Sequence, residues 1–134
     1  ETVAEKPSFR QAFRRHRCLV IADGFYEWKS EGGKKRPFYA HLKSGEPFGM
    51  AGLYNLWTAP DGKQVCTTTI ITTAANKILE PIHDRMPVIT PPGKYDLWLD
   101  PGEPDAEWVI DEDAFSDACC EIDSTRLLLC QVST

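Results

Sequence analysis

The chain has 134 residues, 42% of them hydrophobic and 26% charged, which fits one globular domain and is too short for two. It holds no apolar run long enough for a transmembrane helix, so the sequence argues against a membrane protein. Its five cysteines form no CxxC pair and are odd in number, which argues against a zinc site or a disulfide framework. Because the chain opens on Glu1 without a Met, we expect a piece of a longer protein.

The net charge of −5 hides an uneven distribution along the chain. Residues 1–94 carry 14 Lys and Arg against 9 Asp and Glu, a net of +5, whereas residues 95–134 have a net of −10. A local basic face attracts phosphate whatever the charge of the whole chain. The distribution therefore favours a nucleic-acid partner for the first part, although a solvated surface without a partner explains the same charges.

The first half of the chain predicts one helix followed by strands. Pro7 is typical of a helix start, and Phe9 and Phe13 lie four residues apart on one face. The apolar run after this helix predicts a strand, which we expect to continue beyond a bend at Asp23 and Gly24. The expected elements are a helix over 7–17, strands over 18–22 and 25–29, a hairpin loop over 30–36, and strands over 37–42 and 48–57.

The second half predicts shorter elements. We expect a β-branched strand over 65–73, one or two helical turns over 74–80, a loop over 82–86, a strand over 87–90, a helix over 95–99, an acidic helix over 106–119 and a strand over 127–132. Strands without regular βαβ alternation indicate an α+β fold. We expect mainly antiparallel strands that curve into a barrel-like sheet, flanked by short helices.

Two segments combine titratable side chains with unusual neighbours. Glu27 lies among the aromatic residues of the segment DGFYEW, where desolvation would raise the pKa of a carboxyl group and suit it to acid–base chemistry. His83 lies between a predicted turn and strand, with Arg85 two residues later as a possible phosphate ligand. A solvent-facing Glu27 and a packing His83 beside a surface ion pair are the alternatives.

Two further groups are candidate DNA contacts. Thr72 ends the β-branched run just before the turn that leads to His83, and its hydroxyl could hold a substrate; a threonine-rich strand without function is the alternative. Basic residues that include Arg10 and Arg14 would suit a single-strand groove if aromatic side chains lie among them, or else form a solvated helix face. The motifs of serine hydrolases, zinc peptidases and dinucleotide-binding proteins are absent.

Taken together, these segments resemble the SRAP (SOS response-associated peptidase) family. The resemblance rests on ETVAEKPSFR at the start, ADGFYEW, MAGLY, IITTAAN and IHDRMPVI, in family order and at family-like spacing. It is close over residues 1–99 and weak over the acidic remainder. It implies a single SRAP-like domain over 1–134 that lacks its N-terminal segment and its extreme C-terminus.

The resemblance also implies a function. A SRAP protein would sense abasic sites in single-stranded DNA in the DNA-damage (SOS) response. After self-cleavage of the initiator Met, its N-terminal Cys would form a covalent thiazolidine with the abasic aldehyde. By the same resemblance Glu27 and His83 are catalytic, Arg85 and Thr72 lie near DNA or that Cys, and no metal or other cofactor is required. A cytoplasmic location, at the nucleoid in a bacterium, is expected.

The sequence departs from this family at its start. The Met-Cys-Gly-Arg segment and the Asn-Ala-Arg segment of the family are absent, and no internal Cys has the free α-amine that ring closure requires. We therefore expect the 134-residue chain itself to be inactive in crosslinking. A cysteine peptidase that acts on proteins and a degenerate nucleic-acid-binding module are the alternative functions.

Overall fold

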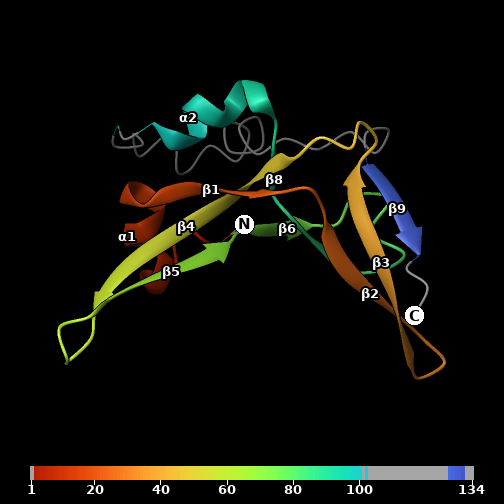
Figure 1. The fold of residues 1–134 in the computed structure, drawn as a ribbon, viewed down its shortest axis with the longest axis horizontal. Coiled ribbons are helices and arrows are strands. Elements are labelled where there is room, and N and C mark those ends of the chain that lie inside the picture. Colours follow the sequence, from red (N-terminus) through yellow and green to blue (C-terminus); the bar gives the residue numbers. More distant parts are fainter. Residues whose placement is uncertain (1, 101, 103–126, 132–134) are drawn as a thin grey trace.

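The computed structural model describes residues 2–100, 102 and 127–131, the last five as a backbone strand (Figure 1). Its elements are α1 (Pro7–Arg15), β1 (Arg17–Ala22), β2 (Phe25–Glu31), β3 (Lys34–Leu42), β4 (Phe48–Thr58), β5 (Gln64–Ile70), β6 (Thr72–Ala74), β7 (Arg85–Pro87), β8 (Ile89–Thr90), η1 (Pro92–Lys94), α2 (Tyr95–Leu99) and β9 (Leu127–Gln131). The paired strands are antiparallel and form three sheets, β1-β4-β5 with β8 on β4, β2-β3-β9, and β6-β7.

This arrangement confirms the α+β class and the mainly antiparallel strands flanked by short helices. The sheets do not close into a barrel within the described residues, because β5 forms an end of its sheet and β2 an end of another. The expected acidic helix over 106–119 lies outside the described residues. None of the described helices has the length and apolar character that crossing a membrane requires.

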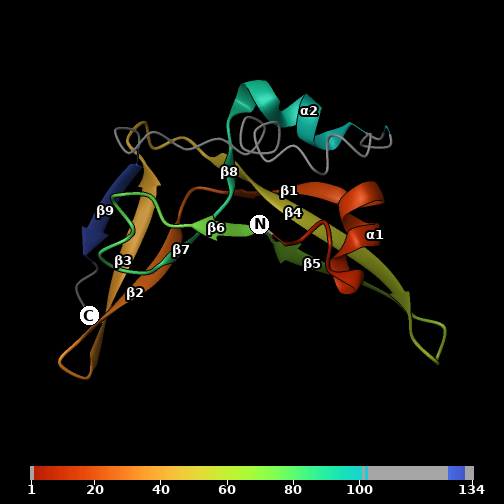
Figure 2. The ribbon, with the colours of Figure 1, turned by 180° about the vertical axis from the view of Figure 1, so that it is seen from behind.

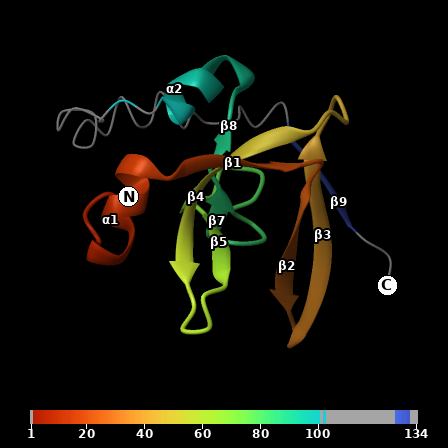
Figure 3. The same ribbon diagram turned by 60° about the vertical axis from the view of Figure 1, so that its left-hand side comes forward.

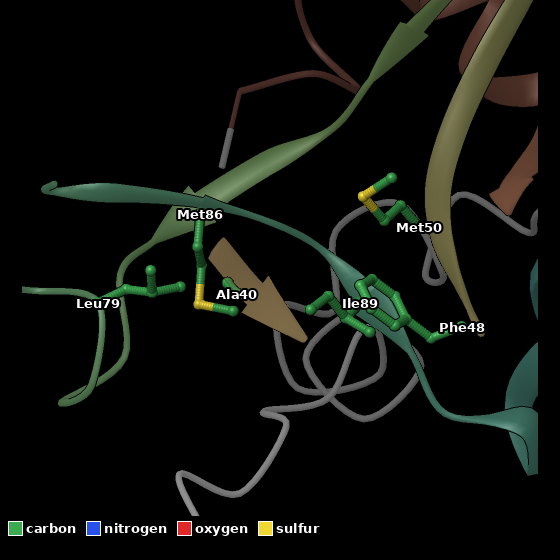
Figure 4. Packing of buried hydrophobic residues seen from close by; sticks show 6 residues of the cluster. All are labelled: Ala40, Phe48, Met50, Leu79, Met86 and Ile89. Carbon is green, nitrogen blue, oxygen red and sulfur yellow. The ribbon is translucent and has the colours of Figure 1, made fainter. Parts of the chain in front are cut away.

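The central strand β4 divides the hydrophobic core into two clusters. Its first six residues are buried, so both faces of the strand are covered. Phe48 and Met50 point into the first core cluster (Figure 4), and Ala51 and Leu53 point into the second cluster, as the alternation of side chains along a strand requires. Figure 3 shows the consequence, with α1 on one side of this strand and the β2–β3 hairpin on the other.

The helices α1 and α2 pack against the second cluster. Phe13 is the buried residue of α1, and its ring meets that of Trp98 of α2 edge to face at 6.0 Å. Arg17 joins the two helix ends, donating to the carbonyls of Phe13 and Trp98 at 2.9 and 2.8 Å, and its guanidinium lies over the Trp98 ring. The predicted helix over 7–17 ends at Arg15, since Arg17 already belongs to β1.

The chain changes sheets at Asp23 and Gly24, which is the first correction to the sequence prediction. The segment 25–29 does not continue the preceding strand but pairs with β3 in a separate sheet. A Cβ atom at Gly24 would lie 2.5 Å from the Tyr39 ring and 2.6 Å from the Ala40 carbonyl oxygen. The sharp change of direction therefore requires a glycine, because the crossing backbone approaches β3 this closely.

The β2–β3 hairpin is longer and its turn tighter than the sequence predicts. The strands run through Glu31 and from Lys34, so the expected loop over 30–36 shrinks to two residues. These are Gly32 and Gly33, with φ of 55° and 78°, the backbone that a two-residue hairpin turn of this hand requires.

The segments after β5 also differ from the prediction. The strand expected over 65–73 is interrupted at Ile71, whose N–H donates to Ala51 O at 2.9 Å, and β6 then pairs with β7 in another sheet. The segment 74–80 forms a single hydrogen-bonded turn: Asn76 O accepts from the N–H groups of Leu79 and Glu80 at 3.0 and 2.9 Å, and the Asn76 side-chain oxygen accepts from those of Ile78 and Leu79, both at 3.1 Å. The Asn76 side chain thus caps the start of this turn, as asparagine does at the first residue of a helix. The strand β7 begins at Arg85, within the expected loop, and Val88 separates it from β8.

Candidate active site

The β6–β7 ladder holds Arg85 and Thr72 together. Ala74 pairs with Arg85 and Thr72 with Pro87, which places both side chains at one short ladder near the middle of the molecule (Figure 2). Arg85 Nη2 donates to the Thr72 carbonyl oxygen at 2.7 Å and approaches its hydroxyl oxygen at 3.3 Å. The structure thus brings together two of the predicted site residues, although they lie 13 residues apart in the sequence.

His83 lies in the loop before this ladder, with its ring half exposed. Its Nδ1 atom lies 3.1 Å from the Arg85 main-chain nitrogen and 3.2 Å from the Arg85 carbonyl oxygen. Asp84 Oδ1 is also 3.2 Å from Nδ1. The imidazole is therefore fixed through Nδ1, and its other nitrogen, Nε2, contacts no polar group among the described residues.

Main-chain hydrogen bonds fix the loop that carries His83. The His83 N–H donates to Leu79 O at 2.9 Å, and the Ala75 N–H donates to Asp84 O at 2.9 Å. Leu79 and Met86 on either side of the loop are buried in the first core cluster, beside Ala40 (Figure 4). The backbone that carries the half-exposed His83 is thus held by hydrogen bonds and by buried neighbours, which is the support that a positioned functional side chain needs.

Glu27 lies on the face of β2 that turns toward the same cluster. Side chains alternate along the strand, so Glu27 shares a face with Phe25, which packs against that cluster. Glu27 is half-buried, whereas Tyr26 and Trp28 on the other face are exposed. The sequence left the orientation of this strand open; the structure turns the carboxylate inward, toward the cluster that also anchors the His83 loop.

The outer face of the β2–β3 hairpin carries a row of aromatic rings. Trp28, Tyr26, Tyr39 and His41 follow one another with centroid separations of 6.3, 5.0 and 5.4 Å. Desolvation raises the pKa of Tyr39, and the charge and hydrogen bond of Asp23 raise it further. Sequence reasoning did not find this row, because its members on β3 become neighbours of Tyr26 only through the register of the hairpin.

The basic residues of α1 lie elsewhere. Arg10 and Arg14 are exposed on one face of the helix and line a recess of about 370 Å³ together with Pro7, Gln11 and Arg15. Since α1 packs on the side of β4 opposite to the β2–β3 hairpin, the structure does not bring these arginines beside Glu27 or the aromatic row (Figure 3). Their assignment as DNA contacts stays a prediction.

Comparison of the sequence with known proteins shows the family to which the chain belongs. The family model described as SOS response associated peptidase (SRAP) matches residues 1–133. The chain belongs to the SRAP family. It is 46% identical over 110 residues to the abasic site processing protein YoqW of Bacillus subtilis, and 33% identical over 123 residues to the abasic site processing protein HMCES of Xenopus tropicalis. These alignments cover 81% and 77% of this chain, but 49% and 37% of the two relatives.

Solved structures agree with the SRAP assignment. A crystal structure of a protein from Bacteroides thetaiotaomicron superposes with a TM-score of 0.86 at 32% identity, covering 98% of this chain and 56% of the other. One from Bordetella bronchiseptica gives 0.82 at 26% identity, covering 99% and 63%. The chain spans about half the length of YoqW, one of the relatives that it matches.

Proposed function

We propose that this chain is the part of an abasic-site processing protein that carries its acid–base residues. The observation that carries the proposal is the shared anchoring of two SRAP motifs. The segment with Glu27 and the segment with His83 lie about 55 residues apart in sequence, and both pack on the first core cluster. The two SRAP relatives YoqW and HMCES are named abasic site processing proteins, which supports an abasic site as the substrate.

The proposed reaction follows from the chemistry of an N-terminal cysteine. The α-amine attacks C1′ of the open-chain sugar aldehyde, water leaves, and the thiol adds to the resulting imine to close a thiazolidine. Glu27 transfers protons at the amine, and His83 acts as acid and base on the sugar oxygen. Self-cleavage of the initiator Met would expose the cysteine. The cysteines of this chain are internal, so we expect the 134-residue chain alone to form no such adduct.

We propose single-stranded DNA as the partner, because an abasic sugar in a single strand is open to attack. Arg85 contacts both Thr72 and His83, and a cation beside the reacting sugar would suit a phosphate group. Arg10 and Arg14, on the other side of β4, would contact only DNA that continues around the molecule. A cytoplasmic or nucleoid location fits a DNA substrate and stays part of the proposal.

A denaturing gel tests this proposal. Single-stranded DNA with one abasic site is incubated with a version of the chain extended upstream to its native start, and the 134-residue chain serves as the negative control. We expect a covalent band from the extended protein only. Replacement of Glu27→Gln or His83→Gln should reduce its rate of formation about 100-fold or more, in the range usual for loss of a general acid or base.

Matched controls separate catalysis from charge and fold. Glu80→Gln removes an exposed carboxylate from the turn before His83, and His41→Gln removes a histidine outside the proposed site; neither should change the rate. An extended, folded protein that gives no band contradicts the crosslinking function. Binding without a band would then favour a nucleic-acid-binding module, and cleavage of added proteins would favour a peptidase.

A further inference from the structure

Three polar groups compete for one nitrogen of His83. The Arg85 N–H lies 3.1 Å from Nδ1, the Arg85 carbonyl oxygen 3.2 Å and Asp84 Oδ1 3.2 Å. The N–H can only donate and the two oxygens can only accept. Because Nδ1 of the neutral ring either carries the proton or accepts one, the surroundings choose between two tautomers with different reactive nitrogens.

The balance of these groups favours a proton on Nδ1. Two acceptors face one donor, and one acceptor is a carboxylate, whose hydrogen bonds are roughly twice as strong as those between neutral groups. An imidazole N–H held by a carboxylate or a main-chain carbonyl is a recurring way to fix the ring and raise the basicity of its other nitrogen. Here that other nitrogen is Nε2, which has no polar contact among the described residues.

The main-chain groups around Nδ1 are themselves fixed. The Arg85 backbone belongs to the ladder with Ala74, and the Arg85 side chain bonds to Thr72. The Asp84 carbonyl accepts from Ala75. Asp84 is held in place by its main chain, while its side chain is 90% exposed. Water therefore screens its charge, and its contribution to stability is small.

We propose that Asp84 is a positioning residue for His83. Together with the Arg85 carbonyl it keeps the proton of the neutral imidazole on Nδ1 and leaves the Nε2 lone pair to take a proton from the substrate. The inference rests on the proposed catalytic role of His83 and adds to it which nitrogen reacts. Among the described residues, the other charged groups on the elements around the ring are Lys77 and Glu80 on the loop, Arg85 on β7 and Glu27 on β2.

The tautomer can be measured in the 134-residue chain without any activity. Long-range proton–nitrogen NMR spectra of uniformly ¹⁵N-labelled protein, recorded where the imidazole is neutral, distinguish the protonated from the unprotonated nitrogen of each ring. His83→Gln assigns the signals of His83 among the three histidines. We expect the wild-type ring to carry its proton mainly on Nδ1, and Asp84→Asn to shift the population toward Nε2.

Glu80→Gln is the matched control, since it removes another exposed carboxylate from the turn before His83; it should leave the tautomer unchanged. A wild-type ring with its proton on Nε2 would overturn the proposal, because Nδ1 would then accept from the Arg85 N–H and could donate no hydrogen bond to Asp84. A tautomer that is the same in Asp84→Asn as in the wild type overturns it as well.

A rate measurement connects the tautomer to the reaction. In the extended protein, Asp84→Asn should slow covalent trapping about tenfold, as loss of an outer partner of a functional histidine typically does, with unchanged noncovalent DNA binding. An unchanged rate would refute the role in the reaction. Absence of any trapping by the wild-type extended protein would instead count against the proposed function, and the NMR result would then stand or fall by itself.

Discussion

On one face of β4, Phe13 and Trp98 of the two helices pack against Ala51 and Leu53; on the other, Phe48 and Met50 meet Met86 of the β6–β7 ladder. The helix face carries the exposed arginines of α1, and the ladder face carries Glu27 and the His83 loop. A single strand thus supports a basic surface and a candidate active site through separate clusters. We infer that each face can be perturbed with limited effect on the other, because residues without shared contacts usually act additively.

The largest expected effect comes from the helix face. Trp98→Ala removes a side chain that is 1% exposed, together with the hydrogen bond from its Nε1 to the Cys18 carbonyl at 2.8 Å. We expect the free energy of unfolding to fall by about 3–5 kcal/mol, measured by urea denaturation. At low denaturant, the NMR signals of His83 should remain where they are in the wild type. Movement of those signals in the folded variant would show that the two faces are coupled.

The converse substitution acts on the ladder face. Leu79 is fully buried, and its carbonyl oxygen accepts the His83 N–H. Leu79→Ala should lower the free energy of unfolding by about 2–5 kcal/mol. It should also shift the His83 signals, because the cavity lies directly under the loop, while the Trp98 indole signal stays unchanged. Leu97→Ala, at an exposed position of α2, is the control that should change neither the free energy of unfolding nor the His83 signals.

The smallest expected effect is a pH dependence of the free energy of unfolding, caused by Cys18 on β1. Desolvation raises the pKa of the Cys18 thiol above its ordinary value of 9.0, and the neighbouring Cys66 raises it further. The unfolded chain therefore loses this proton at a lower pH than the folded one, so stability falls as the pH rises through about 9. Comparison of urea midpoints at neutral pH and near pH 9.5 should show a decline that is smaller in Cys18→Ala. Equal declines in both proteins would assign the effect to other groups, such as Tyr39.

The sequence was sufficient for elements whose pattern is local. Pro7 with Phe9 and Phe13 predicts α1, the apolar run after Arg17 predicts β1, and the motif strings around Glu27 and His83 predict the SRAP family, which the family model confirms. These signals depend on periodicity and residue identity within a few positions, and neither changes when the chain folds.

The tertiary structure decided where strands change partners. Nothing in the residues before Gly24 indicates that β2 leaves the sheet of β1; the crossing is fixed by the close approach of Gly24 to Tyr39 and Ala40. The break at Ile71 likewise follows from its main-chain bond to Ala51. Both depend on contacts with residues far along the chain, which a reading of local pattern does not contain.

The candidate site divides in the same way. The sequence by itself determined which residue types are present, that Glu27 lies among aromatic residues and that His83 is followed by Asp84 and Arg85. Only the fold decided that Glu27 turns inward and that Arg85 reaches Thr72. It also decided that Arg10 and Arg14 lie on the other side of β4 from Glu27. The physical reason is that side-chain orientation on a strand is set by which face is buried, and burial depends on what packs against that face in three dimensions.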